Sequence, residues 1–124
     1  MIYTKMMGFV PTQDLRKARA FYEGLLGLRS VSEDQFALVL DANGTVIRVT
    51  KVTDFKPQPF TILGWQVPDI RQAVSELGDK GIQFARYGMK EQDERGVWTA
   101  PGGALVVWFK DQDGNLLSLT QFPT

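Results

Sequence analysis

The sequence repeats one plan twice, and this repetition restricts the possible folds more than any other feature. DLRKARAFYEGLLG at 14–27 corresponds to DIRQAVSELGDKG at 69–81, since each starts with an aspartate that can cap a helix and ends at glycine. DANGTVIRV at 41–49 corresponds to DQDGNLLSL at 111–119, each a polar turn followed by a β-strand pattern. Two halves of one design are therefore expected.

Each half is predicted as a strand, a helix and a hairpin, with one further strand in an irregular connection, giving eight strands in all. The helices are expected at about 14–26 and 69–78, where apolar residues recur at helical spacing. The halves, about 1–55 and 58–124, should pair within one domain (1–124), because neither has enough strands to bury both faces of its sheet. The strand patterns are MMGFVPTQ (6–13), FALVL (36–40), TVIRVTKV (45–52), TILGWQV (61–67), ALVVWF (104–109) and LLSLTQF (116–122).

Missing residue types limit the chemistry that this chain can perform. It contains no cysteine and no histidine, which excludes thiolate chemistry and the commonest transition-metal ligand. Its formal net charge is zero, so neither nucleic acid nor a membrane surface is expected as a partner. No apolar segment approaches the roughly 20 residues of a membrane span, and the first ten residues lack a signal-peptide pattern. We expect a cytoplasmic protein.

The segment FVPTQDLRKARAFYEGLLGL, together with the later FKDQDGN, resembles the vicinal oxygen chelate superfamily. This superfamily includes glyoxalase I, bleomycin and fosfomycin resistance proteins, and extradiol dioxygenases. The resemblance covers nearly the whole chain and implies an α+β fold of two paired βαβββ modules, whose curved mixed sheets surround a ligand cavity. It also implies a homodimer.

Metal enzymes of the superfamily hold their ion with residues on the first and last strands of each module. Carried over to this chain, those places fall at Met7 and Arg48 in the first half and at Ile62 and Ser118 in the second. A divalent metal prefers imidazole nitrogen or carboxylate oxygen, and none of these four residues supplies either. We therefore expect no metal and no other cofactor.

Period-two alternation sorts the strand residues into two faces. Ile47, Val49, Leu117 and Leu119 are predicted to lie under the helices, together with Trp65 and Trp108. The opposite face should line an apolar cavity with few polar groups, as small-ligand sites commonly do. The predicted ligand-binding residues are Met7, Phe9, Val39, Arg48, Gln66, Val107, Phe109 and Ser118 on strands, and Tyr87 and Trp98 in the irregular segment.

Two of these residues admit more than one interpretation. Arg48 stands in mid-strand between two apolar residues, where an unpaired buried charge would be costly. It could extend over a solvent-open face, form an internal ion pair, or await a ligand carboxylate or phosphate. Trp98, in the GVWTAPGG segment, could line a pocket mouth or pin its own loop.

Three functions fit the sequence. The first is a metal-free binding protein that sequesters a small, flat organic molecule, as the resemblance to bleomycin resistance proteins implies. The second is a lyase, isomerase or dioxygenase of the glyoxalase type, whose catalytic residues the sequence does not identify. The third is a structural or regulatory dimer with a vestigial cavity.

Overall fold

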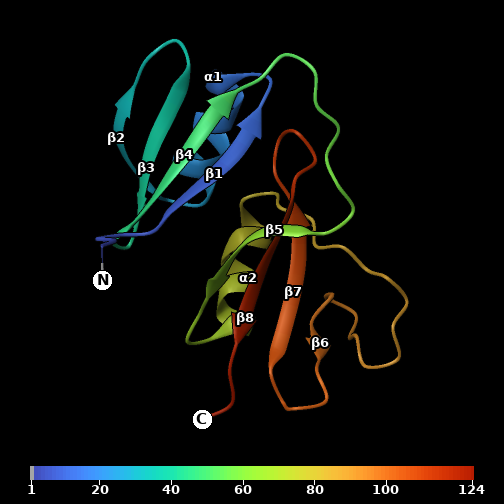
Figure 1. Cartoon of the computed structure of the whole chain (residues 1–124). Helices are drawn as coiled ribbons and strands as arrows, with labels where there is room; N and C mark the ends of the chain where they lie inside the picture. Colours follow the sequence, from blue (N-terminus) through green and yellow to red (C-terminus); the bar gives the residue numbers. More distant parts are fainter. Residues whose placement is uncertain (1) are drawn as a thin grey trace. The chain divides into compact units, whose positions relative to one another are not determined.

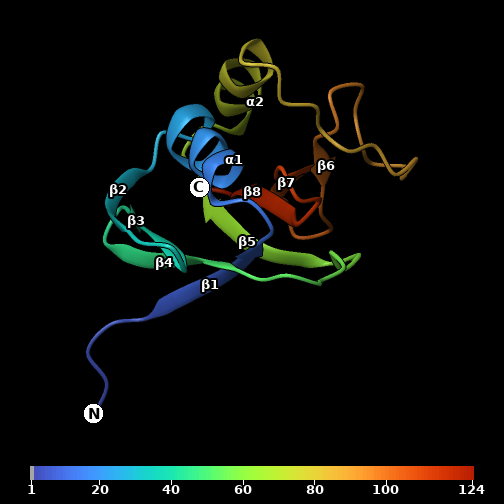
Figure 2. The ribbon, with the colours of Figure 1, turned by 90° about the horizontal axis from the view of Figure 1, so that it is seen from above.

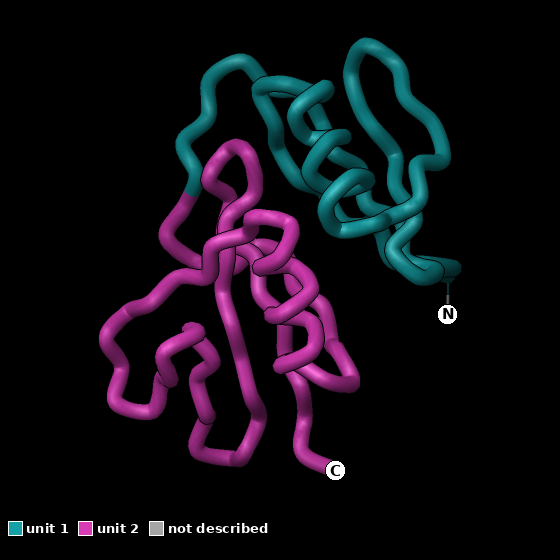
Figure 3. The backbone as a smooth tube through the Cα atoms, turned by 180° about the vertical axis from the view of Figure 1, so that it is seen from behind, with its two compact units in different colours: residues 1–57 teal, residues 58–124 magenta. Residues whose placement is uncertain are grey.

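The computed structural model describes residues 2–124 and contains two four-stranded sheets and a few helices (Figure 1). The chain divides into two compact units, Met1–Pro57 (unit 1) and Gln58–Thr124 (unit 2) (Figure 3). Each unit runs strand, helix, strand, strand, strand along the chain. The predicted α+β fold of two βαβββ modules is confirmed.

Unit 1 consists of β1 (Met7–Thr12), the helical segments α1 (Leu15–Arg19) and η1 (Ala20–Leu25), and three further strands. These strands are β2 (Arg29–Glu33), β3 (Ala37–Ala42) and β4 (Thr45–Lys51). The sheet order is β1-β4-β3-β2. β1 runs parallel to β4, whereas the other neighbours are antiparallel.

Unit 2 repeats this topology with β5 (Thr61–Gln66), α2 (Ile70–Asp79), β6 (Trp98–Thr99), β7 (Leu105–Lys110) and β8 (Leu116–Gln121). Its sheet order, β5-β8-β7-β6, places the strands as in unit 1. β5 is parallel to β8, and the remaining pairs are antiparallel. β6 is only two residues long, so the irregular connection supplies the predicted extra strand in a minimal form.

The two helices begin as predicted. Asp14 accepts hydrogen bonds from the backbone N–H groups of Arg16 and Lys17, at 3.0 and 3.1 Å, and Asp69 accepts one from Gln72 at 3.1 Å. The first helix is not α-helical throughout. Its second half, η1, is a π-helix that closes with a bond from Leu26 N–H to the Phe21 carbonyl.

Each sheet buries one face under its own helix, as Figure 2 shows for both units. In unit 1 the helix-facing side chains are almost inaccessible to solvent; they include Val10, Leu38, Leu40, Ile47 and Val49, and Ala18 and Tyr22 of the helix are buried as well. In unit 2, Val107, Phe109, Leu117 and Leu119 are buried together with Ile70 and Val74 of α2. No helix within residues 2–124 has the length and apolar content needed to cross a membrane.

Candidate functional site

The face of the unit 2 sheet opposite α2 carries two tryptophans. In the strand register, Trp108 lies between Ser118 and the β6 edge of the sheet, and Trp98 is opposite Val106. Cross-strand partners project from the same face of a sheet. Trp108, Ser118, Val106 and Trp98 therefore share the face that no helix of this unit covers.

This register corrects two predicted site residues. Val107 and Phe109 were expected to line the cavity, but both are fully buried and pair with Leu119 and Leu117 on the helix-facing side. Trp108, expected in the core, lies on the open face instead. The prediction that these three residues point the other way was wrong.

The cause of the error is the length of the loop between β7 and β8. In unit 1, two residues separate the strands, so odd-numbered Val39 pairs with even-numbered Arg48. In unit 2, the loop 111–115 has five residues and Lys110 pairs with Leu116, so even-numbered positions pair with even-numbered ones. Changing the loop from an even to an odd number of residues reverses which side chains share a face.

The five-residue loop is fixed by a buried aspartate. The Asp111 carboxylate accepts hydrogen bonds from the backbone N–H groups of Asp113 and Asn115, at 2.9 and 3.0 Å, and from the Asn115 side-chain amide at 2.9 Å. Asp111 and Asn115 are both buried. The side-chain bonds satisfy backbone donors that no strand partner reaches, so the loop length is well determined.

Three aromatic side chains form a cluster on this open face. The ring centroid of Trp108 lies 5.6 Å from that of Tyr87, edge to face, and 5.9 Å from that of Trp98. Beside the cluster is a wide-mouthed pocket of about 420 Å³. Its walls are formed by Pro59, Phe60, Thr61, Tyr87, Met89, Trp98, Trp108 and Leu116. We call this the aromatic pocket.

Gln92 holds the two parts of the irregular segment that reach the aromatic pocket. Its side-chain oxygen accepts the backbone N–H of Tyr87 at 2.8 Å, and its side-chain nitrogen donates to the carbonyls of Ala85 and Gly96, each at 2.9 Å. A bridge between Gln92 and Trp98 extends the same framework. Gln92 thus places Tyr87 and Trp98 without lining the pocket itself.

Asp93 anchors the segment to α2. Its carboxylate pairs with the Arg71 guanidinium at 2.8 Å and accepts backbone N–H groups from Arg95 and Val97, at 2.9 and 3.0 Å. Partial burial raises the pKa of Asp93, but the hydrogen bonds from Arg71, Val97 and Arg95 together outweigh burial, so its pKa lies below the usual range. The ionised carboxylate is the form that holds the segment.

The open face of the unit 1 sheet has a different character. Phe9, Arg48 and Val39 are cross-strand neighbours in one row, and Met7 precedes them on the same face. Phe9 and Met7 remain 63% and 50% exposed.

Arg48 forms no ion pair or side-chain hydrogen bond with residues 2–124. Its charge makes the smallest of the contributions to the low pKa of Asp34, which is lowered mainly by hydrogen bonds from the Phe36 and Ala37 backbone.

Gln66 and Ser118 lie on the open face of unit 2 but outside the aromatic pocket. Gln66 is three strands away from Trp98 in the same row, a distance of about 14 Å at ordinary strand spacing. Ser118 is nearly buried beside Gly64, where a Cβ added to the glycine would stand 2.6 Å from the serine oxygen. Only glycine fits there without moving Ser118.

The structure therefore brings together Tyr87 and Trp98 of the predicted residues and adds others. Trp108, Phe60 and Met89 were missed by sequence reasoning. Counting the five residues of the 111–115 loop would have placed Trp108 correctly. Phe60 and Met89 lie outside regular strands, so no periodic signal marks them.

The four places inherited from the metal enzymes do not fit a divalent ion. Met7 is a half-exposed thioether, Arg48 brings a repelling positive charge, and Ser118 offers one hydroxyl. Ile62 has no donor atom. Within residues 2–124, no three carboxylate side chains gather closely enough to hold a metal.

Comparison with known proteins agrees with this architecture. Residues 4–119 match the family model of the Glyoxalase/Bleomycin resistance protein/Dioxygenase superfamily. No match was found among the curated proteins.

Solved structures share the fold at low sequence identity. A glyoxalase family protein from Bacillus anthracis superimposes with a TM-score of 0.78 at 16% identity, covering 99% of this chain and 98% of its own. A superfamily member from Sphaerobacter thermophilus gives 0.76 at 21% identity, covering 97% and 98%. The bleomycin resistance determinant encoded on the transposon Tn5 gives 0.76 at 20% identity, covering 98% and 100%. By its family match over nearly its whole length, the chain belongs to the Glyoxalase/Bleomycin resistance protein/Dioxygenase superfamily.

Proposed function

We propose that this protein binds a small aromatic organic molecule in the aromatic pocket of unit 2, without a metal ion. The observation that carries the proposal is the cluster of Tyr87, Trp98 and Trp108 around a pocket of about 420 Å³. Small-ligand sites are mostly apolar and aromatic, with a few polar groups that fix orientation. Here Thr61 and the Tyr87 hydroxyl are the polar side chains of the wall.

The expected energetics support affinity without a metal. Stacking on one aromatic ring contributes about 0.5–1.5 kcal/mol beyond the burial of apolar surface. Apolar burial contributes roughly 25 cal/mol per Å². A flat ligand that contacts two of the three rings could reach a micromolar Kd, which corresponds to about 8 kcal/mol.

The composition of the pocket favours binding over catalysis. Among the described residues that line it, there is one tyrosine, Tyr87, and none is a carboxylate or a lysine. A glyoxalase-type lyase, isomerase or dioxygenase would need an acid–base group or a Lewis acid at the reacting atoms. The side chains of Met7, Arg48, Ile62 and Ser118 do not suit such a metal. The similarity in fold to a bleomycin resistance determinant is consistent with sequestration.

We also propose that the protein acts as a homodimer. Met7 and Phe9 are half-exposed or more on the open face of unit 1. Large exposed apolar side chains of this kind commonly mark an association surface. Sedimentation at micromolar concentration should give a species of about twice the 13.9 kDa chain mass. A clean monomer would contradict this part of the proposal.

The binding proposal is tested with a panel of flat aromatic compounds, followed by tryptophan fluorescence and thermal unfolding. A binder should quench fluorescence and raise the Tm. Trp108→Leu should weaken its affinity about tenfold, a loss of roughly 1.4 kcal/mol. The matched control is Phe122→Leu, since Phe122 is an exposed aromatic outside the pocket. Binding should survive a chelator. Equal effects of both variants, or chelator sensitivity, would contradict the proposal.

A further inference from the structure

We infer that a second hollow beside the aromatic pocket accepts a positively charged ammonium group of the bound ligand. The inference rests on the proposed function, because the aromatic part of the same ligand would occupy the aromatic pocket. The ligand class is therefore an aromatic molecule that carries a primary or quaternary ammonium group. The residue that selects this class is Glu91.

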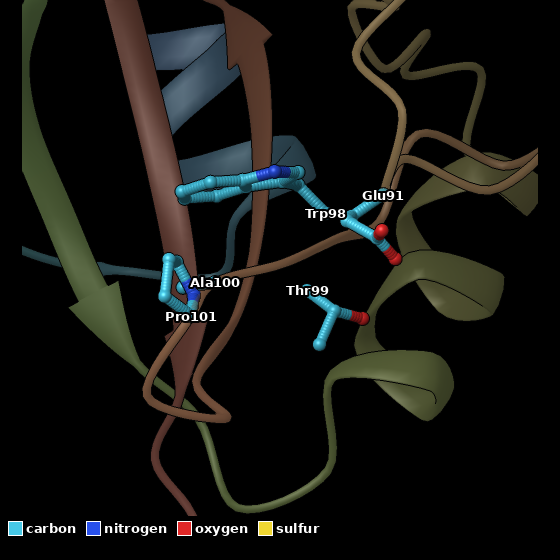
Figure 4. Close-up of a pocket in the computed structure, with 5 residues that line it drawn as sticks. All are labelled: Glu91, Trp98, Thr99, Ala100 and Pro101. Atoms are coloured by element: carbon cyan, nitrogen blue, oxygen red, sulfur yellow. The ribbon is translucent and has the colours of Figure 1, made fainter.

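The second hollow has a volume of about 310 Å³ and is lined by Glu91, Trp98, Thr99, Ala100 and Pro101. Figure 4 shows the indole ring of Trp98 edge-on, extending over Pro101, with the side chains of Thr99 and Glu91 beside the hollow. Trp98 also lines the aromatic pocket. One ligand could therefore contact the two hollows through a single shared side chain.

The backbone fixes Glu91 next to this indole. The Thr99 backbone N–H donates to the Glu91 carbonyl at 3.0 Å, and Gln92 forms a bridge with Trp98. Asp93 N–H donates to the Val97 carbonyl at 2.9 Å, which continues the ribbon by one pair. The position of the Glu91 backbone is therefore set by the same framework that presents Trp98.

Charge decides which ligand group suits the hollow. Glu91 is its only charged lining residue and forms no ion pair with residues 2–124. The neighbouring Asp93, by contrast, is neutralised by Arg71 at 2.8 Å. An unpaired carboxylate attracts a cation and repels an anion, and the face of an indole ring also attracts ammonium groups. The two attractions act on the same class of ligand.

The test compares two probes of equal shape. One is (2-naphthylmethyl)trimethylammonium, and the other is its neutral carbon analogue, in which a tert-butyl group replaces the trimethylammonium. Wild-type protein should bind the cationic probe about three- to tenfold more tightly. Glu91→Gln should reduce this preference to the smaller part that the indole face supplies, and it should leave the affinity for the neutral probe unchanged. The preference should also shrink as salt is added, because the carboxylate is exposed to solvent.

The matched control is Glu94→Gln, which removes the same charge from an exposed position of the same segment outside both hollows. It should keep the preference for the cation. If Glu91→Gln keeps the full preference, or weakens both probes equally, the ammonium site is refuted while binding in the aromatic pocket stands. If wild-type protein binds neither probe, the ammonium site and the proposed function both fail.

Discussion

The two units share one topology, but their open sheet faces are lined by different chemistry. In unit 1 the row Phe9, Arg48 and Val39 presents one cation among exposed apolar groups. In unit 2 the corresponding face presents Trp98 and Trp108. The repeated fold therefore supplies two similar platforms, and the one in unit 2 carries an aromatic cluster beside a pocket.

The connection after each helix explains much of this difference. In unit 1, η1 ends at Leu25 and β2 begins at Arg29, so a short connection leads into a five-residue strand. In unit 2, α2 ends at Asp79 and the two-residue β6 begins only at Trp98. The longer connection supplies Tyr87 and Met89 to the pocket wall. Loops carried by a rigid sheet are common places for binding residues.

The largest expected effect is a difference in the free energy of unfolding between variants on the two faces of β7. Phe109→Ala should lower the free energy of unfolding by about 3–5 kcal/mol, since Phe109 is fully buried and packs edge-on against Phe84. Trp108→Ala, one residue away on the open face, should cost clearly less. Chemical denaturation of both variants measures the difference. Equal losses would mean that Trp108 belongs to the core.

A smaller loss of stability is expected at Gln92, which has no counterpart in the short connection of unit 1. Gln92→Ala leaves the Tyr87 N–H and the Ala85 and Gly96 carbonyls without their partner, at a cost of about 1–3 kcal/mol. Affinity for aromatic ligands should fall as well, because Tyr87 and Trp98 lose their support.

Gln72→Ala is the control for this change, since within residues 2–124 the Gln72 side chain donates a hydrogen bond only to Glu76, on the exposed surface of α2. It should leave stability and affinity nearly unchanged. A Gln92 variant that binds normally would show that the segment keeps its shape without this side chain.

Replacing Arg48 tests whether unit 1 contributes to ligand binding. If its guanidinium contacts a ligand carboxylate or phosphate, Arg48→Ala should weaken anionic aromatic ligands about tenfold and neutral ones hardly at all. Calorimetric titration with an acid and its neutral amide measures the two effects. An unchanged affinity for the anion would leave Arg48 as a residue that extends over an open strand face, and binding would rest on unit 2 alone.

The smallest expected effect concerns pH. The pKa of Asp93 is lowered in the folded protein, so its contribution to stability is present above the unfolded value of about 3.9 and is lost as pH falls through the lower, folded pKa. Asp93→Asn should therefore reduce the loss of stability on acidification below about pH 4. Urea midpoints between pH 5 and pH 3 measure this slope. The pKa of Asp34 in unit 1 is also lowered, so Asp34→Asn should act in the same direction. An unaltered slope in the Asp93 variant would show that the carboxylate does not hold the segment in solution.

Much of the fold was predictable because it depends on local rules. Asp14 and Asp69 cap their helices through hydrogen bonds to backbone N–H groups two or three residues further along the chain. Gly27, with a φ of +77°, ends the first helix in the left-handed region that glycine favours. The register of the β3–β4 hairpin could also be predicted from the sequence, because its two-residue turn fixes which residues pair.

The candidate site was harder to predict because its residues depend on register and on irregular backbone. The 111–115 loop has an odd number of residues. Because this was overlooked, Trp108 was predicted on the helix-facing side of the sheet, and Val107 and Phe109 were predicted on the open face. Tyr87 and Trp98 were predicted as site residues because binding residues tend to lie in loops that are set over a rigid sheet. The hydrogen bonds of the Gln92 side chain, which position Tyr87 and Trp98, join residues four to seven places apart in the sequence. They follow neither helical nor strand periodicity, so no sequence pattern predicts them.

The most direct test of binding in unit 2 is a crystal structure of the protein with a polycyclic aromatic ligand. The ligand rings should lie with their centroids about 4.5–7 Å from those of Trp98 or Trp108, inside the aromatic pocket. A ligand held on the Phe9, Arg48 and Val39 row, with the aromatic pocket empty, would contradict the proposed function and assign binding to unit 1.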